Sequence, residues 1–368
     1  MKNKNLFLKS YKNLKVLITG TTGFKGSWLA FWLNDLGAKV VGVALKPETG
    51  SILFDKLNLK KKISQYDIDI CNFNKLNSTI KKEKPDIIFH LAAQSIVSES
   101  FKNPLNTFQT NVLGSVNILE ACRLNRIPKL VYITSDKCYL NLNKKKNYKE
   151  TDVLGGLDNY SSSKASAELI FSSYYNSYFN NNNYLSTVSA RAGNVIGGGD
   201  MKINRIVPDI IRSLSCNKKL ILRNPKATRP WQHVLEPISG YLNLAQALCS
   251  DKSLNGEGFN FGPRAEQNRT VAELLHDLSA YWHFEDASDA FTVTDNIPFH
   301  EAGLLKLNCD KSLALLRWQA ALDYRETIKF TSEWYYEYYK NDIDMMAKTI
   351  SQINAYQNTA NAKGLLWT

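Results

Sequence analysis

A hydroxyl, a carboxylate and an amine follow one another near the end of the stretch Leu130-Val-Tyr-Ile-Thr-Ser-Asp-Lys-Cys-Tyr139. The apolar run at residues 130–133 is typical of a buried β-strand, so Ser135, Asp136 and Lys137 are expected at its carboxyl end. In open α/β sheets, ligands bind outside the carboxyl ends of the strands. These three side chains are therefore predicted to face a crevice, where they could exchange protons with a bound substrate.

A second pattern, Tyr160 followed four residues later by Lys164, lies further along the chain. Residues four apart on a helix share a face, so the phenol and the amine can act on the same ligand. That spacing also arises often on surface helices. The pair therefore indicates chemistry only when a cofactor site accompanies it.

A glycine-rich turn supplies such a site. It lies between a short β-branched run, residues 15–19, and an amphipathic stretch, residues 27–36. Strand, glycine turn and helix follow in the order that a dinucleotide site requires, because glycines let backbone amides approach a pyrophosphate at the helix amino terminus. The predicted cofactor contacts in this turn are Gly20, Thr22, Gly23, Phe24, Lys25 and Gly26.

Further cofactor contacts are expected where the next strands end. The second strand, residues 38–45, is followed by Lys46 and lacks the acidic residue that binds the ribose 2′-hydroxyl of NAD, so this turn leaves NAD and NADP both open. A third strand is expected over residues 66–70, and a fourth over residues 86–93 ends in small side chains that allow close approach to a ligand. The predicted contacts at these two ends are Asp69, Ile70, Leu91, Ala92 and Ala93.

The alternation of strands and helices predicts an α/β fold, a doubly wound parallel Rossmann sheet with right-handed crossovers and a smaller C-terminal substrate-binding lobe. Helices are expected over residues 104–125 and 159–178, and a strand over residues 185–190. After the glycine-rich residues 191–200 the pattern loosens. We therefore expect an NAD-binding Rossmann domain over residues 12–200, a lobe that mainly binds nucleotide sugar over 201–340, and a polar tail over 341–368.

The segment Arg223-Asn-Pro-Lys-Ala-Thr-Arg-Pro-Trp-Gln-His233 places cationic side chains beside aromatic ones. This combination suits a nucleotide diphosphate and its base or sugar, although a solvated basic loop would show the same pattern. The predicted substrate contacts are Gln94, Ser95, Asn194, Arg205, Arg223, Arg229 and His233.

The net charge of +12 is concentrated in residues 1–150, which hold 25 Lys and Arg against 11 Asp and Glu. The excess lies in lysine clusters without interleaved aromatic residues, so we expect no nucleic-acid binding. No apolar run approaches the length of a membrane span. The six cysteines are scattered, which fits neither a zinc site nor a disulfide framework. We expect a cytoplasmic protein with reduced thiols, no membrane association and no metal.

Several longer motifs resemble those of a known group. They are Thr134-Ser-Asp-Lys-Cys-Tyr139, Leu154-Gly-Gly-Leu-Asp-Asn-Tyr-Ser-Ser-Ser-Lys164, Arg191-Ala-Gly-Asn-Val-Ile-Gly-Gly-Gly-Asp200 and Arg223-Asn-Pro-Lys-Ala-Thr-Arg-Pro-Trp-Gln-His-Val-Leu-Glu236. With the glycine turn, they resemble the extended short-chain dehydrogenases/reductases that act on nucleotide sugars, and most closely the CDP-glucose 4,6-dehydratases. The likeness runs from about residue 12 to residue 340. Other dehydratases of the group usually carry Thr-Asp-Glu at residues 135–137, so the lysine there is the discriminating residue.

The resemblance implies a mechanism with NAD as a cofactor that is regenerated at every turnover. Tyr160 would take the proton of the sugar 4-hydroxyl during oxidation at C4, with Lys164 lowering the tyrosine pKa and holding the nicotinamide ribose. Ser135 would hydrogen-bond the same sugar oxygen. Lys137 would then act as the base at C5 and Asp136 as the acid at the C6 hydroxyl, roles that require a neutral amine and a protonated carboxyl.

The resemblance also implies a homodimer or homotetramer, paired through the helices over residues 104–125 and 159–178, and a place in deoxysugar or O-antigen-type polysaccharide biosynthesis. Three positions depart from the family pattern: Thr21 stands where the family commonly has His, Leu140 where it has Glu, and Met201 where it has Trp.

Three alternatives stay open at this point. One is another nucleotide-sugar 4,6-dehydratase of the same fold. A nucleotide-sugar 4-epimerase shares the fold and the Tyr–Lys pair but has no use for an acid and a base at C6 and C5. A non-enzymatic dinucleotide-binding scaffold is also compatible with the fold, because a fold does not determine a function.

Overall fold

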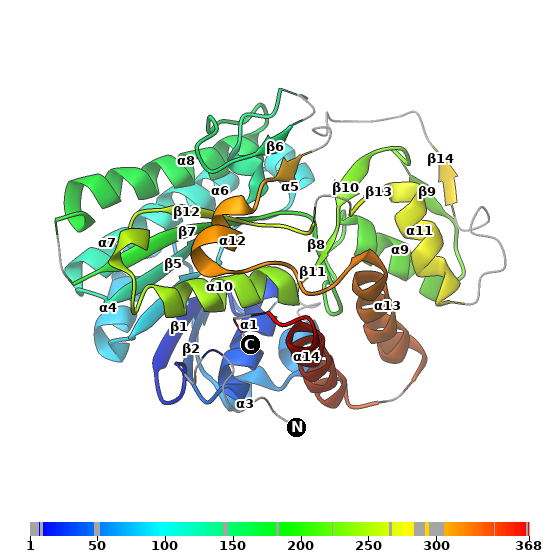
Figure 1. Ribbon diagram of the computed structural model, residues 1–368, viewed down its shortest axis with the longest axis horizontal. Coiled ribbons are helices and arrows are strands. Elements are labelled where there is room, and N and C mark those ends of the chain that lie inside the picture. The colour runs from blue at the N-terminus through cyan, green and yellow to red at the C-terminus, as the bar shows by residue number, and fades with distance from the viewer. Residues whose placement is uncertain are drawn as a thin grey trace.

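Seven parallel strands form the central sheet of the computed structural model (Figure 1), in the order β12-β7-β5-β4-β1-β2-β3. The structure describes residues 7, 10–47, 52–142, 146–181, 184–222, 224–264, 267–282, 291–293, 305–341, 343–365 and 367. The strands of the sheet are β1 (Lys15–Thr19), β2 (Lys39–Ala44), β3 (Ser64–Asp67), β4 (Ile87–His90), β5 (Lys129–Ile133), β7 (Ser186–Ala192) and β12 (Gly258–Phe261). This arrangement confirms the predicted doubly wound α/β fold.

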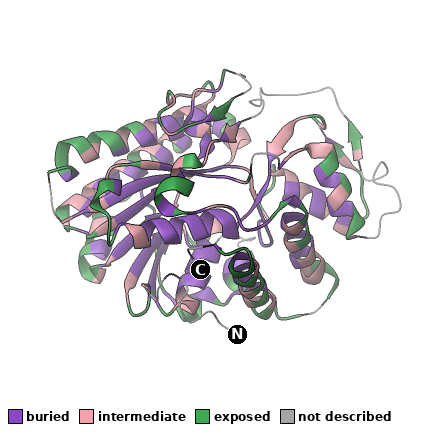
Figure 2. Ribbon diagram, viewed as in Figure 1, coloured by how far each residue is buried: buried purple, intermediate pink, exposed green. Residues whose placement is uncertain are grey.

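Helices cover both faces of this sheet. One face carries α1 (Phe24–Asp35), α10 (Leu235–Ala247) and α14 (Met345–Ala362), and the other carries α4 (Phe73–Glu83), α7 (Gly114–Leu124) and α8 (Asn159–Tyr174). Successive side chains of a strand point to opposite faces, so Val16 and Ile18 pack with the first set of helices and Leu17 with the second. Because helices cover both faces, most of the strands are buried, as Figure 2 shows, while the edge strand β3 is only partly buried.

Several of the remaining elements form a second lobe at the right of Figure 1. The helices are α2 (Ile52–Lys56), α3 (Leu59–Lys62), α5 (Val97–Lys102), α6 (Pro104–Phe108), α9 (Ile206–Ser215), α11 (Val271–Ala280), α12 (Asp310–Leu316) and α13 (Tyr324–Lys340). The strands pair two by two: β10 (Thr228–Pro230) with β13 (Asn268–Thr270), β11 (Gln232–His233) with β8 (Val195–Ile196), β14 (Phe291–Val293) with β9 (Leu220–Leu222), and β15 (Lys306–Leu307) with β6 (Asn147–Tyr148).

The division between sheet and lobe is not a single point in the chain. Helix α10 packs on the sheet, and β12 pairs with β7 at its edge, so residues 235–261 return to the first body. The prediction that residues 201–340 lie in the second lobe is therefore wrong for this stretch. Phe259 and Phe261 are fully buried, but a strand this short carries too little periodicity to be recognised as part of a distant sheet.

The predicted polar tail is a helix with a buried side. In α14, Ile353, Tyr356 and Ala360 are buried, and the ring of Trp367 stacks on Phe7 at a centroid distance of 5.8 Å. The Tyr356 hydroxyl donates a hydrogen bond of 2.8 Å to the buried Glu236 carboxylate. The expectation of a tail is wrong because this apolar stripe is narrow, and the Gln and Asn residues around it hide it in the sequence.

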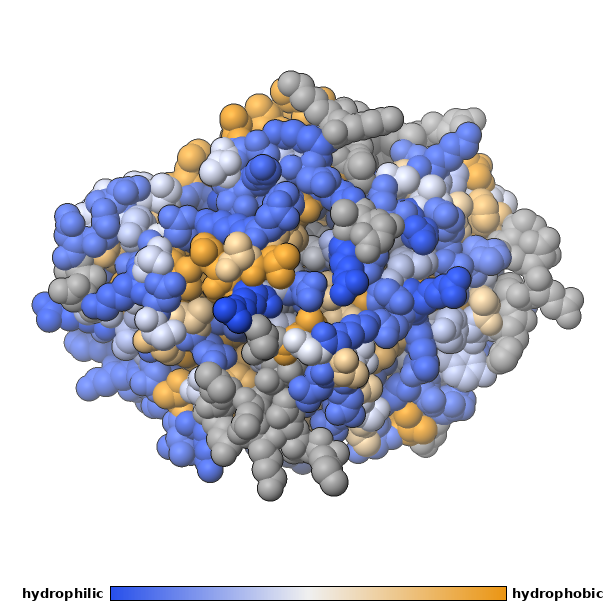
Figure 3. Space-filling model, in the orientation of Figure 1, coloured by the Kyte–Doolittle hydropathy of each residue, from blue (hydrophilic) through white to orange (hydrophobic). Residues whose placement is uncertain are grey.

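The face of the molecule shown in Figure 3 is mostly hydrophilic. Apolar atoms gather in the middle of this view over α12, where Leu313 and Leu315 are exposed. Across the described residues, no helix combines the length and the apolar character that a bilayer crossing requires.

Candidate active site

A cavity of about 580 Å³ lies at the carboxyl ends of β1, β2, β4, β5 and β7. Its volume is within the range of about 300–1,000 Å³ that small-molecule sites occupy. The strand order reverses beside β1, which lies between β2 and β4, and such a point is where α/β sheets bind ligands. The cavity wall includes the predicted residues Gly20, Thr22, Gly23, Phe24, Lys25, Gly26, Asp69, Ile70, Leu91, Ala92, Ala93, Gln94, Ser95, Ser135, Asp136, Lys137, Tyr160, Lys164, Asn194 and Arg205.

The turn after β1 has room for backbone but not for side chains. Gly20 has a φ of +83°, and a Cβ atom there would lie 2.9 Å from the backbone nitrogen of Ala92. A Cβ atom at Gly26 would lie 2.0 Å from the carbonyl oxygen of Gly20. Helix α1 starts directly after Gly23 and has no acidic residue in its first turn, so its amino terminus faces the cavity as a favourable place for an anion. These residues fit the pyrophosphate of a dinucleotide.

The end of β2 forms the neighbouring wall through Ala44, Leu45 and Lys46. The Thr22 hydroxyl donates a 3.2 Å hydrogen bond to the carbonyl oxygen of Leu45, which ties the glycine turn to this strand end. Across the cavity, Asp69 accepts a 2.8 Å hydrogen bond from the backbone nitrogen of Cys71. The nearest charged side chain that β2 itself offers to a ligand is therefore cationic.

A short 3-10 turn, Asp136–Cys138, follows β5 and carries the predicted acid and base. The Ser135 hydroxyl accepts a 3.3 Å hydrogen bond from the backbone nitrogen of Lys137 and donates one of 2.9 Å to the Asp136 carboxylate. Because the turn ends the alternation of the strand, Asp136 and Lys137 both line the cavity instead of pointing to opposite faces. The Asp136 carboxylate lies against Gly193, where a Cβ atom would come within 2.0 Å of it.

Helix α8 brings the Tyr–Lys pair to the same cavity. Its amino terminus is capped by Asp158, which accepts a 2.9 Å hydrogen bond from the backbone nitrogen of Ser161. Tyr160 and Lys164 are both buried and both line the cavity. Burial lowers the pKa of Lys164 to about 8 because a charged amine is poorly solvated there.

The pKa of the Tyr160 phenol is raised in the chain without a bound ligand. Burial raises the pKa of Tyr160 to about 12, and a hydrogen bond from Ser135 and the positive charge of Arg205 only partly offset that rise. The negative charge of Asp136 adds to it. The expected lowering of the tyrosine pKa by Lys164 stays a prediction for the site with its cofactor, where a cation bound beside the phenol would act against this shift.

Gln94 and Ser95 are held by neighbouring side chains. Asn111, in a π-helical turn at Gln109–Leu113 between α6 and α7, accepts a 2.8 Å hydrogen bond from the Gln94 backbone and donates one of 2.9 Å to Ser163 on α8. Ser95 accepts a 2.5 Å hydrogen bond from Arg205. The helix predicted over residues 104–125 is thus interrupted where its side chains support the site, as π-turns often are.

Positive charge gathers on one side of the cavity. Arg205 forms a 2.8 Å ion pair with Asp200, and both residues line the wall with Lys202. The pKa of Lys25 is lowered to about 8, first by burial and then by the positive charges of Arg205 and Lys164, against the opposing charges of Asp136 and Asp200. An anionic ligand such as a diphosphate would relieve the repulsion among these cations.

Two of the predicted substrate contacts lie outside this cavity wall. His233 is fully buried, with its ring edge-on to Trp28 at 6.0 Å and to Phe330 at 5.4 Å, and burial lowers its pKa to about 3. Arg229 lies on β10 opposite Arg269 of β13 and is not among the residues that line the cavity. The structure thus does not bring these two residues to the cavity, because the segment enters two short strands and, of its described residues, only Trp231 reaches the wall. Arg223 lies outside the described residues.

The sequence reasoning missed several wall residues. Trp231, Lys202 and Asp200 line the cavity, and Gly193 leaves the space that Asp136 occupies. The glycine-rich motif at residues 191–200 was the available signal for two of them, but no local pattern showed which strand ends it would meet. No group of three or more His, Cys, Asp or Glu side chains is arranged to hold a metal ion within the described part of the chain.

Comparisons with known proteins agree with this site. The sequence matches the family described as GDP-mannose 4,6 dehydratase over residues 17–331. It is 41% identical over 355 residues to CDP-glucose 4,6-dehydratase of Salmonella typhimurium, which covers 95% of this chain and 97% of that protein. It is 29% identical over 301 residues to dTDP-D-glucose 4,6-dehydratase of Dictyostelium discoideum, covering 76% of this chain and 64% of that protein.

Solved structures share the fold. A dTDP-glucose 4,6-dehydratase from Streptomyces venezuelae with NAD and TYD bound has a TM-score of 0.77 at 21% identity, over 88% of this chain and 97% of that one. UDP-glucose 4-epimerase from Thermotoga maritima has a TM-score of 0.76 at 20% identity, over 88% and 99%. The fold is thus common to dehydratases and epimerases. The family match and the near-full-length relative together show that this chain belongs to the GDP-mannose 4,6-dehydratase family, as a homologue of CDP-glucose 4,6-dehydratase.

Proposed function

We propose that this protein is a nucleotide-sugar 4,6-dehydratase that converts CDP-glucose to CDP-4-keto-6-deoxyglucose with loss of water. The observation that carries the proposal is the position of Asp136 and Lys137 in the cavity that also holds Ser135, Tyr160 and Lys164. A 4-epimerase needs the Tyr–Lys pair but no acid and base for elimination. The relative that is 41% identical supports the cytidine nucleotide.

NAD is the proposed cofactor. The turn from Gly20 to Gly26 and the amino terminus of α1 would hold its pyrophosphate, and Lys164 would hold the nicotinamide ribose. When bound, the cofactor supplies the acceptor for a hydride from C4 and its return to C6. Lys46 at the end of β2 is the residue that could accept a 2′-phosphate. Calorimetric titration should show tighter binding of NAD+ than of NADP+, and the reverse order would contradict the choice.

The side chains can carry the proton transfers of the reaction. Tyr160 accepts the proton of the C4 hydroxyl, assisted by its hydrogen bond to Ser135. The resulting 4-keto group acidifies the C5 proton, which Lys137 removes. Asp136 donates a proton to the C6 hydroxyl, which leaves as water while a C5–C6 double bond forms. Reduction at C6 and return of the proton from Lys137 to C5 complete the 4-keto-6-deoxy sugar.

The cations of the cavity support an anionic substrate. Lys25, Lys202 and Arg205 line the wall and could hold a diphosphate through charge-assisted hydrogen bonds. Asn194 also lines the wall beside Gly193, with a φ of +54° that turns the chain there. We assign Lys202, Arg205 and Asn194 to the nucleotide end of the substrate, because Lys25 belongs to the glycine turn proposed for the cofactor.

A panel of nucleotide sugars tests the proposal. The chain, loaded with NAD+, is incubated with CDP-, dTDP-, GDP- and UDP-glucose, and each product is weighed by mass spectrometry. We expect the loss of one water, fastest with CDP-glucose. A product of unchanged mass would indicate a 4-epimerase instead. Cofactor binding without conversion of any sugar would indicate the non-enzymatic scaffold.

We further propose at least a homodimer. It would form through α6, the π-helical turn and α8, on the face of the sheet that α4, α7 and α8 cover. Leu105 of α6, Leu113 of the π-helical turn and Leu169 of α8 are 68%, 48% and 58% exposed, and such apolar side chains suit a bundle with a second copy. The reaction product is an intermediate suited to deoxysugar biosynthesis. The six cysteines are unpaired, which supports a reducing, cytoplasmic location.

A further inference from the structure

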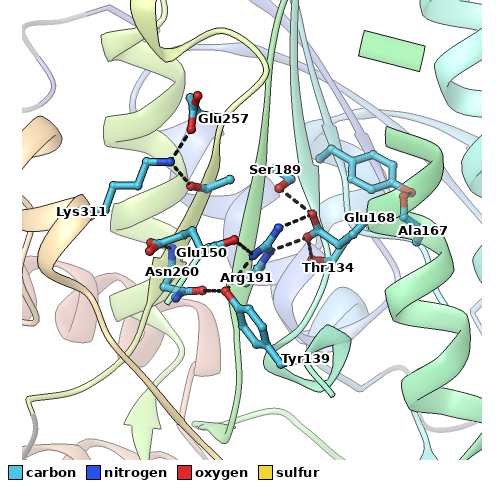
Figure 4. Close-up of polar contacts among 12 residues, drawn as sticks. Thr134, Tyr139, Glu150, Ala167, Glu168, Ser189, Arg191, Glu257, Asn260 and Lys311 are labelled. Atoms are coloured by element: carbon cyan, nitrogen blue, oxygen red, sulfur yellow. Dashed lines mark hydrogen bonds and ion pairs between the residues drawn. The ribbon is translucent and has the colours of Figure 1, made fainter. Parts of the chain in front are cut away.

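A buried ion pair lies directly behind the active site (Figure 4). Glu168 is on α8, one helical turn after Lys164, and Arg191 is on β7. The guanidinium donates from Nη2 to Oε2 of the carboxylate at 2.8 Å and from Nε to Oε1 at 2.9 Å, and the two side chains are 6% and 2% exposed. Removing two charges from water is costly unless their remaining hydrogen-bonding capacity is used. The partners of this pair therefore matter.

Every described partner of the carboxylate and two further partners of the guanidinium come from the protein interior. Glu168 accepts hydrogen bonds from the Thr134 hydroxyl and, at 2.9 Å, from the Ser189 hydroxyl. Arg191 donates at 2.7 Å to the Tyr139 hydroxyl and at 3.2 Å to the Glu150 backbone. Burial would raise the pKa of Glu168, but Arg191 and these hydrogen bonds outweigh it and lower that pKa. The pair therefore stays charged.

Two of these partners lie on either side of the turn Asp136–Cys138 and Ser135 before it, here called the catalytic turn. Thr134 directly precedes Ser135 and is bonded to Glu168, and Tyr139 directly follows the turn Asp136–Cys138 and is bonded to Arg191. Figure 4 shows the Tyr139 hydroxyl directed at Arg191 and Thr134 beside Glu168. The Tyr139 hydroxyl also donates a 2.8 Å hydrogen bond to Asn260 of β12, so the end of the turn is tied to the sheet edge as well.

We propose that the Glu168–Arg191 pair is a positioning device for the catalytic turn, holding both of its ends in register with Tyr160 and Lys164 on the same helix. This inference rests on the proposed dehydratase function. Glu168, Arg191 and Tyr139 are not among the residues that line the cavity, and Thr134 lines it with its hydroxyl bonded to Glu168. Each of these side chains therefore acts through the turn. Because a misplacement of about 1 Å can cost about 100-fold in rate, loosening one end of the turn should lower turnover without removing a catalytic group.

Two hydroxyls bonded to the same carboxylate provide a matched test. Thr134→Val and Ser189→Ala each remove one hydrogen-bond donor to Glu168, but only Thr134 is attached to the catalytic turn. With NAD+ and CDP-glucose, we expect Thr134→Val to lower kcat by about 10- to 100-fold with little change in KM. Ser189→Ala should stay within about twofold, because the turn is untouched. Thr134→Ser, which keeps the hydroxyl, should restore kcat.

Melting temperature and calorimetric binding of NAD+ are measured on the same preparations. We expect similar melting temperatures for Thr134→Val and Ser189→Ala, and unchanged cofactor affinity, because neither residue belongs to the glycine turn. Equal turnover in both variants, or an equal loss in both, would overturn the inference, since the pair would then be only structural. An unmodified chain that forms no product would instead refute the proposed function, and the inference would fall with it.

A second variant covers the case in which Thr134→Val does not fold. Tyr139→Phe removes the hydroxyl at the other end of the turn and keeps the ring, over which the Arg191 cation lies at 5.1 Å. Tyr148→Phe is its control, because Tyr148 stacks on Tyr139 at 5.3 Å but bonds Asn141 and Leu140 instead of the ion pair. A kcat about tenfold lower for Tyr139→Phe than for Tyr148→Phe is expected, and equal values would overturn the inference.

Discussion

Ionisable side chains in two successive stretches of helix α8 are buried, but burial favours the neutral form in the first stretch while the charged form persists in the second. Tyr160 and Lys164 are 7% and 6% exposed, and Glu168 with its partner Arg191 are 2% and 5% exposed. Burial moves the first two toward their neutral forms, raising the pKa of Tyr160 to about 12 and lowering that of Lys164 to about 8. In the second pair, Arg191 keeps the pKa of Glu168 below its usual value despite burial.

The difference shows that the partner, and not burial alone, decides whether a buried group stays charged. A group that must gain and lose protons during catalysis is useful when neither form is strongly favoured. Lys164 forms no ion pair with any of the described residues. A group that must hold other residues in place is useful when its charge does not change. The same helix provides both kinds.

Removing the proposed C5 base should produce the largest effect on the catalytic side of this comparison. Lys137→Met leaves Tyr160 and Lys164 intact, so oxidation at C4 remains possible while elimination slows by about 10²–10⁴-fold. Enzyme-bound NADH should then build up with CDP-glucose, because no C6 acceptor forms. Stopped-flow absorbance of NADH and mass spectrometry of the product check this expectation. Normal turnover without NADH accumulation would remove Lys137 from the mechanism.

Breaking the ion pair should produce the largest effect on the positioning side. Arg191→Met leaves the Glu168 carboxylate buried without its cation, and such a change typically costs about 3–5 kcal/mol in the free energy of unfolding. The double variant Glu168→Leu with Arg191→Met should recover much of that stability, because no unpaired charge remains, and should still turn over slowly. Denaturant unfolding measures the first expectation and steady-state kinetics the second.

An exposed ion pair nearby is the control for that experiment. Lys311 bonds Glu257 at 2.6 Å, with side chains 23% and 50% exposed, beside the same strand edge (Figure 4). Lys311→Met should change the unfolding free energy by about 1 kcal/mol or less. A loss as large as that of Arg191→Met would mean that burial does not separate the two pairs.

The pH dependence of the unfolding free energy should show that burying the Lys164 amine destabilises the fold while the amine is charged. Its pKa falls from 10.5 to about 8 on folding. Between those two values the unfolded chain holds a proton that the folded chain has released, so stability from this group rises with pH, by up to about 3 kcal/mol. Lys164→Met removes that dependence. Its stability relative to the unmodified chain, measured without cofactor, should be greatest at or below pH 8 and smallest near pH 10.5. An equal difference at both would contradict this reasoning.

A substitution on the exposed face of α8 should have the smallest effect on the stability of a single chain. Leu169 follows Glu168 directly but is exposed, so Leu169→Asp should change the stability of one chain by about 0.5 kcal/mol or less. It should nevertheless shift the light-scattering mass toward the monomer at micromolar concentration, because it places a charge in the proposed interface. Leu315→Asp, on the exposed patch over α12 in Figure 3, should leave the mass unchanged. A monomeric unmodified chain would refute the dimer.

Local rules were enough to predict several features of the site from the amino-acid sequence. Glycine spacing identified the turn after β1, because only glycine tolerates a φ of +83° and the close approach to Ala92. The apolar run at Lys15–Thr19 identified its strand to the residue. Tyr160 and Lys164, four apart, had to share a helix face. Each of these inferences needs only neighbours within a few positions of the chain.

The contacts between residues far apart in the chain follow from packing and could not be predicted in this way. Glu168 and Arg191 are 23 positions apart and lie on a helix and a strand, so no periodicity could pair them. His233 is a polar residue in a basic segment, yet packing against Trp28 and Phe330 places it in the core. The return of β12 to the sheet likewise depends on the free edge of β7. The entropic cost of closing a loop varies only slowly with its length, so residues far apart in the chain can pair almost as readily as nearer ones. The local sequence therefore gives almost no sign of which distant residues will meet.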